Sequence, residues 1–252
     1  MLGRLRRDLT STFSWAGWLP IIHRAPAGSI ALSFDDGPSP ETTPRILALL
    51  QRHGAKAAFF LLGTRVADHP DLVRILAEAG HGVYAHGFNH VRLDQLPPEQ
   101  AIEELARTEA LLSRVRRTPS PYLVRLPYGS GHRDARIHAL LRAWKPDCQI
   151  VHWRYDFKDF LLAEGCATQQ ELAQRCQDAV RRALAHRTFQ GSVVLMHENP
   201  IGVTGPLVPE IAAMLLHTLL TEVGRRGIGI ADVTPQSGLS FLRRHVRTVR
   251  ME

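Results

Sequence analysis

The sequence predicts an α/β protein built on a parallel sheet or a (β/α) barrel. Short apolar runs rich in β-branched and aromatic residues alternate along the chain with longer segments of helical periodicity. Most of the short runs are apolar at consecutive positions, which is typical of strands that are buried on both faces. A chain of 252 residues is long enough to bury a complete core within one domain.

Seven runs are predicted to be strands. They lie at 29–34, 57–62, 81–86, 122–126, 149–153, 192–196 and 228–233. Between them, helical segments are predicted at 43–54, 69–80, 97–117, 132–144, 168–187 and 207–226. The first two of these begin near a proline and end at Gly54 and Gly80, which are favourable residues at those positions. The third has Glu in its first turn and Arg in its last, which matches the helix dipole.

The chain is predicted to form a single domain, because it contains no linker, low-complexity stretch or internal repeat. We expect residues 29–236 to be this domain, preceded by a capping or peripheral segment at 1–28 and followed by a basic tail at 237–252. The segment 157–170 is the least regular, and we expect it to be a loop near the active face.

The charge of the chain favours anionic partners, since the formal net charge is +7. Basic residues gather at the two ends: Arg4, Arg6, Arg7, Arg243, Arg244, Arg247 and Arg250. These ends are either solvated termini or a weak attachment to an anionic membrane surface or a lipid-linked substrate. No nucleic-acid partner is expected, because base-stacking aromatic residues are not interleaved with the arginines. The oligomeric state is left open.

The cysteines predict a reducing compartment. There are three, an odd number without CxxC spacing, which favours free thiols over disulfides. No run of about 18 apolar residues is present to span a membrane. The opening segment has only a short, interrupted apolar stretch and is not interpreted as a secretory signal. We therefore expect a cytoplasmic protein, with membrane-peripheral attachment as an open alternative.

Polar residues follow the predicted strands at the edge where active sites of parallel α/β folds are found. These residues are Asp35, Asp36, His86, His90, Arg125, Tyr128, Asp156, Asp159 and His197. The spacing H-x-x-x-H lets His86 and His90 reach one cation, and one carboxylate completes a His₂Asp set with room for water. One of the adjacent aspartates can neutralise the metal while the other stays free as a base. The sequence therefore predicts one divalent ion: Zn²⁺ is the default, with Co²⁺, Ni²⁺ or Mn²⁺ as alternatives.

Five segments in this order, "SFDDGP", "HGFNH", "RLPYG", "DFKDF" and "LMH", resemble the motifs of the polysaccharide deacetylase family (NodB-homology domain, carbohydrate esterase family 4). The resemblance spans about 30–235. It implies a distorted (β/α)₇ barrel, which agrees with the seven predicted strands. It also implies a metal-dependent hydrolase that removes an N-acetyl or other acyl group from an aminosugar in a polysaccharide, oligosaccharide or glycoconjugate.

The resemblance also implies roles for individual residues. Asp35 resembles the general base, and Asp36, His86 and His90 resemble the three metal ligands. Arg125 would hold Asp35 in place. His197 resembles the general acid, which the carboxylate of Asp159 would keep protonated.

The remaining residues carried over by motif position would contact the substrate or its oxyanion. The backbone N–H of Tyr128, next to Pro127, would help to bind the oxyanion. Leu195 would line the pocket for the acyl methyl group. Phe160 would form part of the pocket wall, where the family usually has Trp.

The chain departs from the family pattern at a few positions. Ser33 stands where Thr is commoner, Gly87 where Ser or Thr is usual, and Glu198 where Asp is common. None of these changes removes a ligand or a proton carrier, but together they favour a less usual substrate. The alternatives are a deformylase or amidase acting on a lipid-linked sugar or other small amide, and a sugar-binding module without catalysis.

Overall fold

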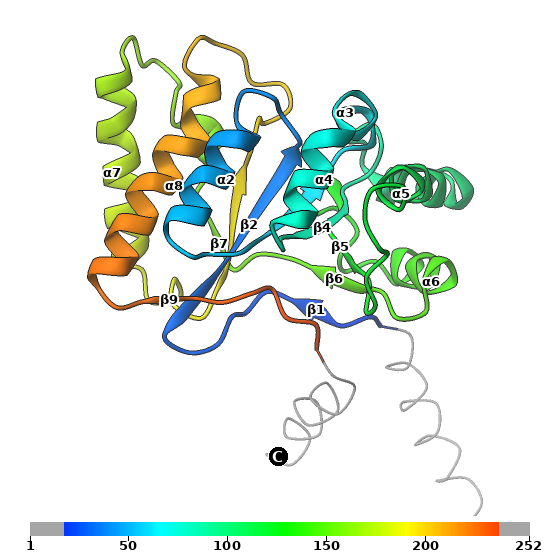
Figure 1. Cartoon of the computed structure of the whole chain (residues 1–252). Helices are drawn as coiled ribbons and strands as arrows, with labels where there is room; N and C mark the ends of the chain where they lie inside the picture. The colour runs from blue at the N-terminus through cyan, green and yellow to red at the C-terminus, as the bar shows by residue number, and fades with distance from the viewer. Residues whose placement is uncertain (1–17, 237–252) are drawn as a thin grey trace, which may run out of the picture.

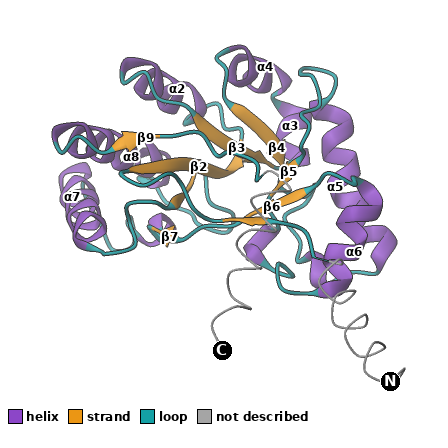
Figure 2. Cartoon of the chain, turned by 90° about the horizontal axis from the view of Figure 1, so that it is seen from below, coloured by secondary structure: helices purple, strands orange, loops and turns teal. Residues whose placement is uncertain are grey.

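The computed structural model describes residues 18–236, in which parallel strands form a distorted barrel surrounded by helices (Figures 1 and 2). One sheet has the order β4-β3-β2-β8-β7, with β9 also pairing with β2, and the other has the order β1-β6-β5. Every paired strand runs parallel to its neighbour. The predicted α/β barrel is therefore confirmed. Its strands form two separate parallel sheets and not one continuous hydrogen-bonded sheet.

The strands are β1 (Ile21–Ile22), β2 (Ser29–Gly37), β3 (Ala57–Leu61), β4 (Gly82–Ala85), β5 (Leu123–Val124), β6 (Gln149–Val151), β7 (Tyr155–Asp156), β8 (Val193–His197) and β9 (Gly229–Ile230). The α-helices are α2 (Thr43–Arg52), α3 (Gly63–Asp68), α4 (Pro70–Glu78), α5 (Pro98–Leu112), α6 (Ala135–Trp144), α7 (Gln169–Ala185) and α8 (Val208–Arg225). Three short 3₁₀ turns lie at η1 (Leu93–Gln95), η2 (Pro127–Gly129) and η3 (Asp159–Leu161).

The barrel interior is a small apolar cluster to which six strands contribute. Its members are Ile22, Ala31, Ala58, Phe60, Leu123, Val151 and Val193. A larger cluster lies between the outer faces of the strands and the helices. Because both faces of the central strand are covered, all nine residues of β2 are buried, which explains why the residues before Asp35 are apolar apart from Ser29 and Ser33.

Two of the two-residue strands, β1 and β7, were not predicted, whereas β5 and β9 lie within the predicted runs 122–126 and 228–233. Residues Ile21–Ile22 fall within the segment 1–28 that was expected to be a cap, and they pair with β6. Beyond them the backbone N–H of Ala25 donates to the Gly191 carbonyl at 3.0 Å, next to the start of β8. The N-terminal part of the described chain thus lies between the two sheets as part of the barrel wall. The short helix α3 was also missed.

One predicted helix is shorter than expected. The pattern at 97–117 predicts helix to its last residue, but α5 ends at Leu112. The chain then turns so that Arg116 reaches back to the Glu109 carboxylate at 2.7 Å and to the Val83 carbonyl at 2.8 Å. These bonds and the carboxylate of Glu109 join the end of the helix to β4.

The two ends of the described chain meet at the edge where the strands begin (Figure 1). The backbone of Gln236 exchanges hydrogen bonds of 2.8 and 2.9 Å with the side chain of Gln149, and its own side chain donates to the Ile21 carbonyl. Residues 1–17 and 237–252, which include the seven arginines at the two ends, lie outside the described residues. Among residues 18–236, no helix is both long enough and apolar enough to cross a membrane.

Candidate metal centre and active site

A bulge at the end of β2 explains how two adjacent aspartates face one cavity. Side chains alternate along a strand, so Asp35 points to the barrel interior as Ala31 does, and Asp36 would point away. The register with β3 shifts between Asp35 and Gly37, and Asp36 has a left-handed backbone with φ 67°. The bulge turns Asp36 back, and both carboxylates line the same cavity.

Asp36, His86 and His90 form a cluster in which one ligand atom from each lies within 4.8 Å of the others. The Oδ1 atom of Asp36 is 3.3 Å from Nε2 of His90 and 3.6 Å from Nε2 of His86. Donors bound tetrahedrally to Zn²⁺ at about 2.0–2.1 Å lie about 3.3–3.4 Å apart, close to these separations. Among the described residues this is the only such group of three or more potential ligands.

The chemistry of these donors also fits a cation. The buried Oδ1 of Asp36 has no hydrogen-bond partner, while its Oδ2 accepts from the Ile201 N–H at 3.2 Å. Nδ1 of His86 lies 2.8 Å from the Arg125 carbonyl, which can only accept, so Nδ1 carries the hydrogen and Nε2 presents its lone pair. Burial lowers the pKa of His86 to about 3 and also lowers that of His90. Both rings are therefore neutral at pH 7, as metal ligands must be.

The loop that carries His90 is braced from α5. Glu104 accepts hydrogen bonds from the backbone N–H groups of Phe88 and Asn89, each at 2.8 Å, and from the Asn89 side chain at 2.7 Å. Thr108 donates to the Gly87 carbonyl at 2.9 Å. These two side chains hold the loop at the position where the family's usual hydroxyl is replaced by Gly87.

Asp35 is held by a buried arginine. Nη1 of Arg125 donates to Oδ1 of Asp35 at 2.6 Å, and the guanidinium lies 4.3 Å above the ring of Phe60. Burial raises the pKa of Asp35, and the charge of Arg125 opposes that rise by favouring the carboxylate. The second oxygen of Asp35 is 3.6 Å from Nε2 of His86, so it lies beside the cluster. This arrangement leaves a carboxylate next to the cluster with one oxygen fixed by Arg125.

His197 lies directly across from Asp35, since the two residues are register partners on β8 and β2. Nδ1 of His197 lies 2.7 Å from the buried carboxylate of Asp159, which also accepts from the His197 backbone N–H at 2.7 Å. Burial alone would lower the pKa of His197, but the charge and hydrogen bond of Asp159 outweigh it and raise the pKa to about 10. The ring is therefore protonated at neutral pH and can donate a proton.

The cavity that joins these groups has a volume of about 360 Å³. Of the other residues predicted at the site, Tyr128, Leu195 and Phe160 line it, as does Asp156. Pro127 does not line the cavity; its ring lies behind the ligand loop, against Gly87. The structure therefore brings all the predicted site residues to one end of the barrel, with Pro127 in a supporting position.

Backbone strain is concentrated at this end of the barrel. The non-glycine residues with left-handed backbone among the described ones are Asp36, His90, Tyr128 and Lys158. The first three line the cavity, and Lys158 precedes Asp159. Each such conformation costs about 1–3 kcal/mol and persists where the surrounding structure enforces it, most often at functional sites.

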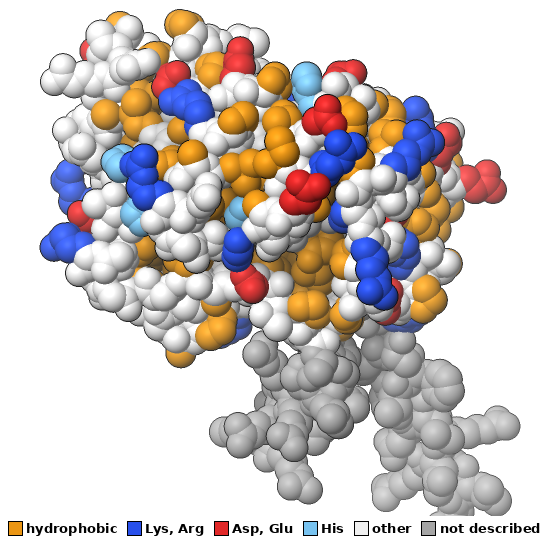
Figure 3. Space-filling model, viewed as in Figure 1, with side chains coloured by type: hydrophobic (Ala, Val, Ile, Leu, Met, Phe, Trp, Pro, Cys, Tyr) orange, Lys and Arg blue, Asp and Glu red, His pale blue; other side chains and the backbone are white. Residues whose placement is uncertain are grey.

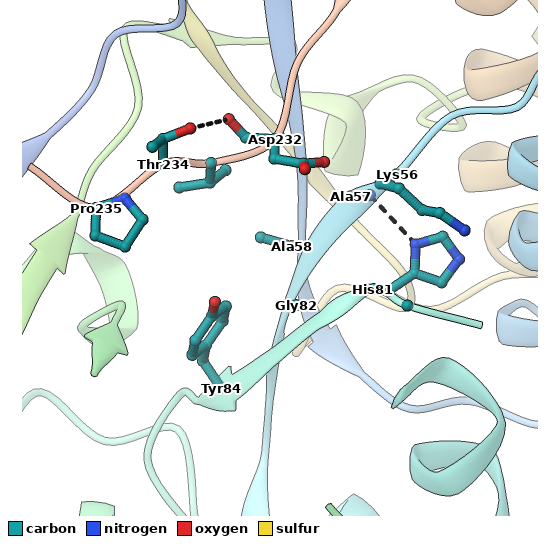
Figure 4. A pocket seen from close by; sticks show the side chains of 11 residues that line it. Lys56, Ala57, Ala58, His81, Gly82, Tyr84, Asp232, Thr234 and Pro235 are labelled. Carbon is teal, nitrogen blue, oxygen red and sulfur yellow. Dashed lines mark hydrogen bonds between the residues drawn. The ribbon is translucent and has the colours of Figure 1, made fainter. Parts of the chain in front are cut away.

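A second cavity, of about 380 Å³, lies at the opposite end of the barrel where β3 and β4 begin (Figure 4). Lys56, His81, Tyr84 and Asp232 line it, and the Ala57 N–H donates to Nδ1 of His81 at 3.3 Å. It contains neither the ligand cluster nor the Asp159–His197 pair. The potential metal ligands and proton-transfer groups therefore lie at the other end, where the strands finish.

Several residues that support the site were not found by sequence reasoning. Arg65 on α3 donates from Nη1 to the carbonyl of Asp36 and, at 2.7 Å, to that of Asn199. Glu104 on α5 accepts a hydrogen bond from the loop that carries His90, and the backbone N–H of Ile201, after β8, donates to Asp36. Their spacing along the chain follows no period, so only the folded structure reveals them.

Comparisons with known proteins identify the family. A family model described as "Polysaccharide deacetylase" matches residues 23–144. A chitooligosaccharide deacetylase from Rhizobium leguminosarum bv. trifolii is 32% identical over 172 residues, which cover 68% of this chain and 72% of that protein. The chain belongs to the polysaccharide deacetylase family, as the motifs predicted.

Two further similarities concern peptidoglycan enzymes. A peptidoglycan-N-acetylglucosamine deacetylase from Bacillus cereus is 31% identical over 198 residues, covering 78% of this chain and 66% of the relative. A crystal structure titled as a peptidoglycan N-acetylglucosamine deacetylase matches with a TM-score of 0.68 and 26% identity, covering 87% of this chain and 94% of that one. The chain thus spans just under two thirds of the length of the first curated relative and 36% of another.

Proposed function

We propose that this protein is a metal-dependent hydrolase that removes the N-acetyl group of an aminosugar. The observation that carries the proposal is the cluster of Asp36, His86 and His90 beside Asp35, with protonated His197 across the strand pair from Asp35. The relatives named above are deacetylases of peptidoglycan and chitooligosaccharides, and their names support an N-acetylated aminosugar as the substrate class.

Each side chain of the site has a defined task in this reaction. The free oxygen of Asp35 accepts a proton from the attacking water, while Arg125 fixes the orientation of the carboxylate. Tyr128 lines the cavity, and its backbone N–H supports the oxyanion of the tetrahedral intermediate. His197 donates a proton to the departing amine, which is a poor leaving group without it. Leu195 lines the floor, where the acyl methyl group lies.

Zn²⁺ is the ion we propose for the cluster. Two neutral imidazoles and one carboxylate suit Zn²⁺ in a catalytic site with an open position, although Co²⁺, Ni²⁺ and Mn²⁺ accept the same donors. When bound, a divalent cation supplies Lewis acidity that polarises the acyl oxygen and acidifies water. Elemental analysis of the purified protein, followed by reconstitution with each ion, tests this choice.

The proposed reaction is tested by measuring acetate release from N-acetylated glycans before and after metal removal. We expect activity to be lost with chelator and restored by added metal. Asp35→Asn should keep the metal but lose turnover, and His86→Ala should lose both. His217→Ala, an exposed histidine on α8, is the matched control. Full turnover by the stripped protein, or by Asp35→Asn, would contradict the proposal.

We also propose that the basic ends attach the protein to an anionic surface. The segments 1–17 and 237–252 together contain seven of the 31 Lys and Arg residues and only two of the 24 acidic residues, so both ends are basic. On the face of the described residues that Figure 3 shows, basic and acidic side chains are interspersed. Co-sedimentation with vesicles of phosphatidylcholine, with and without phosphatidylglycerol, tests the attachment. Glutamine at Arg243 and Arg244 should weaken binding to the anionic vesicles only.

A further inference from the structure

Large hydrophobic side chains are exposed around the mouth of the active-site cavity. Among residues 18–236, four large hydrophobic residues are exposed; two of them, Tyr128 (58%) and Ile201 (43%), are at this cavity, and a third, Leu161 (46%), is adjacent in sequence to it. Tyr128 and Ile201 line the cavity, and Leu161 follows the lining residue Phe160. Such a concentration of exposed apolar surface marks a contact site, whereas isolated exposed residues need no explanation.

The wall of the cavity near this mouth offers few hydrogen-bonding groups. Apart from the ligand cluster and the proton-transfer residues Asp35 and His197, Asp156 is the one charged side chain that lines the cavity. One of its oxygens already accepts from the Lys158 N–H at 2.7 Å. The other lining residues are Tyr128, Gly129, Trp153, Phe160, Leu195, Pro200, Ile201 and Val203. Among these side chains only the Tyr128 hydroxyl and the Trp153 indole N–H can hydrogen-bond, so a sugar ring seated here finds few partners for its hydroxyl groups, whereas an apolar group gains from burial.

Hydrogen bonds fix the position of the apolar segment that contains Ile201 and Val203 relative to the cluster of Asp36, His86 and His90. The Ile201 N–H donates to Oδ2 of Asp36, and Arg65 links the carbonyl groups of Asp36 and Asn199. The segment 199–203 between β8 and α8 is therefore tied to a metal ligand at two points. An apolar group bound on Ile201 and Val203 would lie at a defined distance from the amide being cleaved.

We propose that the preferred aminosugar carries an apolar aglycone, an alkyl or aryl group, which binds to the surface formed by Tyr128, Phe160, Leu161, Ile201 and Val203, the apolar mouth. This inference rests on the proposed function. The acyl group occupies the floor at Leu195, which is 3% exposed. The mouth is therefore reached by the group on the amine side of the substrate, which is the sugar and its aglycone.

The test compares the methyl and octyl β-glycosides of N-acetylglucosamine, with the octyl compound below its micelle concentration. We expect kcat/KM for acetate release to favour the octyl glycoside by about ten-fold or more, mainly through KM, because even one methylene in an apolar site is worth about ten-fold. Ile201→Ser and Val203→Ser should reduce this ratio. The ratio is the readout because a change at the metal centre affects both glycosides alike.

Ile75→Ser is the matched control. Ile75 on α4 is the fourth exposed large hydrophobic residue, at 48%, and does not line the cavity. Its variant should keep the wild-type ratio. A ratio near one in the wild type, or a ratio that survives in both Ile201→Ser and Val203→Ser, would overturn the inference. A higher kcat/KM for N,N′-diacetylchitobiose than for the octyl glycoside would also overturn it, because the mouth would then bind a second sugar ring.

A binding measurement separates this inference from the proposed function. Calorimetry with metal-loaded Asp35→Asn should show tighter binding of the octyl than of the methyl glycoside without any turnover. Metal-dependent hydrolysis of both glycosides with equal affinity would preserve the proposed function and overturn the apolar mouth. Tighter binding of the octyl glycoside, with no hydrolysis of either glycoside by the wild type, would preserve the apolar mouth and overturn the proposed function.

Discussion

The carboxylate of Asp159 receives both the backbone N–H of His197 and Nδ1 of its ring, each at 2.7 Å. The first bond holds the backbone at the last residue of β8, and the second sets which ring nitrogen faces the cavity. A single buried acid thus determines the position, the ring orientation and the charge of the proposed general acid.

Asp159→Asn should move the basic limb of the pH profile. The pKa of His197 is raised to about 10 by Asp159, so the wild type should keep its proton donor until the pH approaches that value. Without the negative charge of Asp159, burial dominates and the pKa of His197 falls. The pH at which activity begins to decline should therefore be more than one unit lower in the variant than in the wild type. At pH 8 we expect kcat/KM to fall by about 100-fold or more.

The measurement is kcat/KM for acetate release between pH 5 and pH 10.5. Asp178→Asn, on the exposed face of α7, serves as the control and should keep the wild-type profile. A basic limb that stays in place in Asp159→Asn would show that a different group controls it.

Arg65→Met should weaken metal binding, because the guanidinium fixes the backbone of Asp36 and of the segment that donates to its carboxylate. Changing groups that orient metal ligands typically costs about 10–100-fold in affinity. Arg65→Lys can reach one of the two carbonyl groups and should recover part of the loss. Arg74→Met, an exposed arginine on α4, should bind metal normally. Competition with a chromophoric chelator gives the affinities; equal values for Arg65→Met and wild type would rule out this role.

Glu104→Ala should loosen the loop that carries His90. The change removes the acceptor of three hydrogen bonds to Phe88 and Asn89. Leaving such donors without a partner costs about 1–3 kcal/mol when they are buried, and less here because the loop is partly exposed. We expect a lower Tm and weaker metal binding, both measurable without substrate. Glu103→Ala, the exposed neighbour on α5, controls for the loss of a carboxylate; matching effects in the two variants would contradict the brace.

Glu198 should make the stability of the protein depend on pH. Burial raises the pKa of this carboxyl to about 8, although Thr43 donates a hydrogen bond to it. The pKa of Glu198 is therefore higher in the folded than in the unfolded protein. Its contribution to the free energy of unfolding is complete below about pH 4.5, where the carboxyl is protonated in both states, and is lost as the pH rises through 8.

Glu198→Gln imitates the protonated carboxyl at every pH. The difference in Tm between this variant and the wild type should therefore increase from pH 5 to pH 9, in favour of the variant. Glu210→Gln, which removes a partly exposed partner of Arg45, should show no such trend. A constant difference across this range would mean that Glu198 is ionised in the folded protein.

Long, regular elements could be predicted from the sequence, and short or tertiary ones could not. Helices α2, α4, α6, α7 and α8 lie within or close to their predicted ranges because each repeats an apolar face over several turns. Strands β1 and β7 were missed because neither two-residue strand lies in one of the runs predicted as strands, whereas the equally short β5 and β9 lie within the predicted runs 122–126 and 228–233. Helix α5 ends early because Arg116 bonds back to Glu109 and Val83, contacts that no local pattern encodes.

By itself the sequence determined the alternation of strands and helices, and the order in which acids, imidazoles and Arg125 follow successive strands. Topology then requires these groups to share one end of the barrel, because parallel strands finish at a common edge. Only the tertiary structure decided that a bulge turns Asp36 toward His90, that Glu104 and Arg65 brace the ligands, and that the mouth is apolar. These features depend on contacts between residues far apart in the chain, which have no periodicity to read in the sequence.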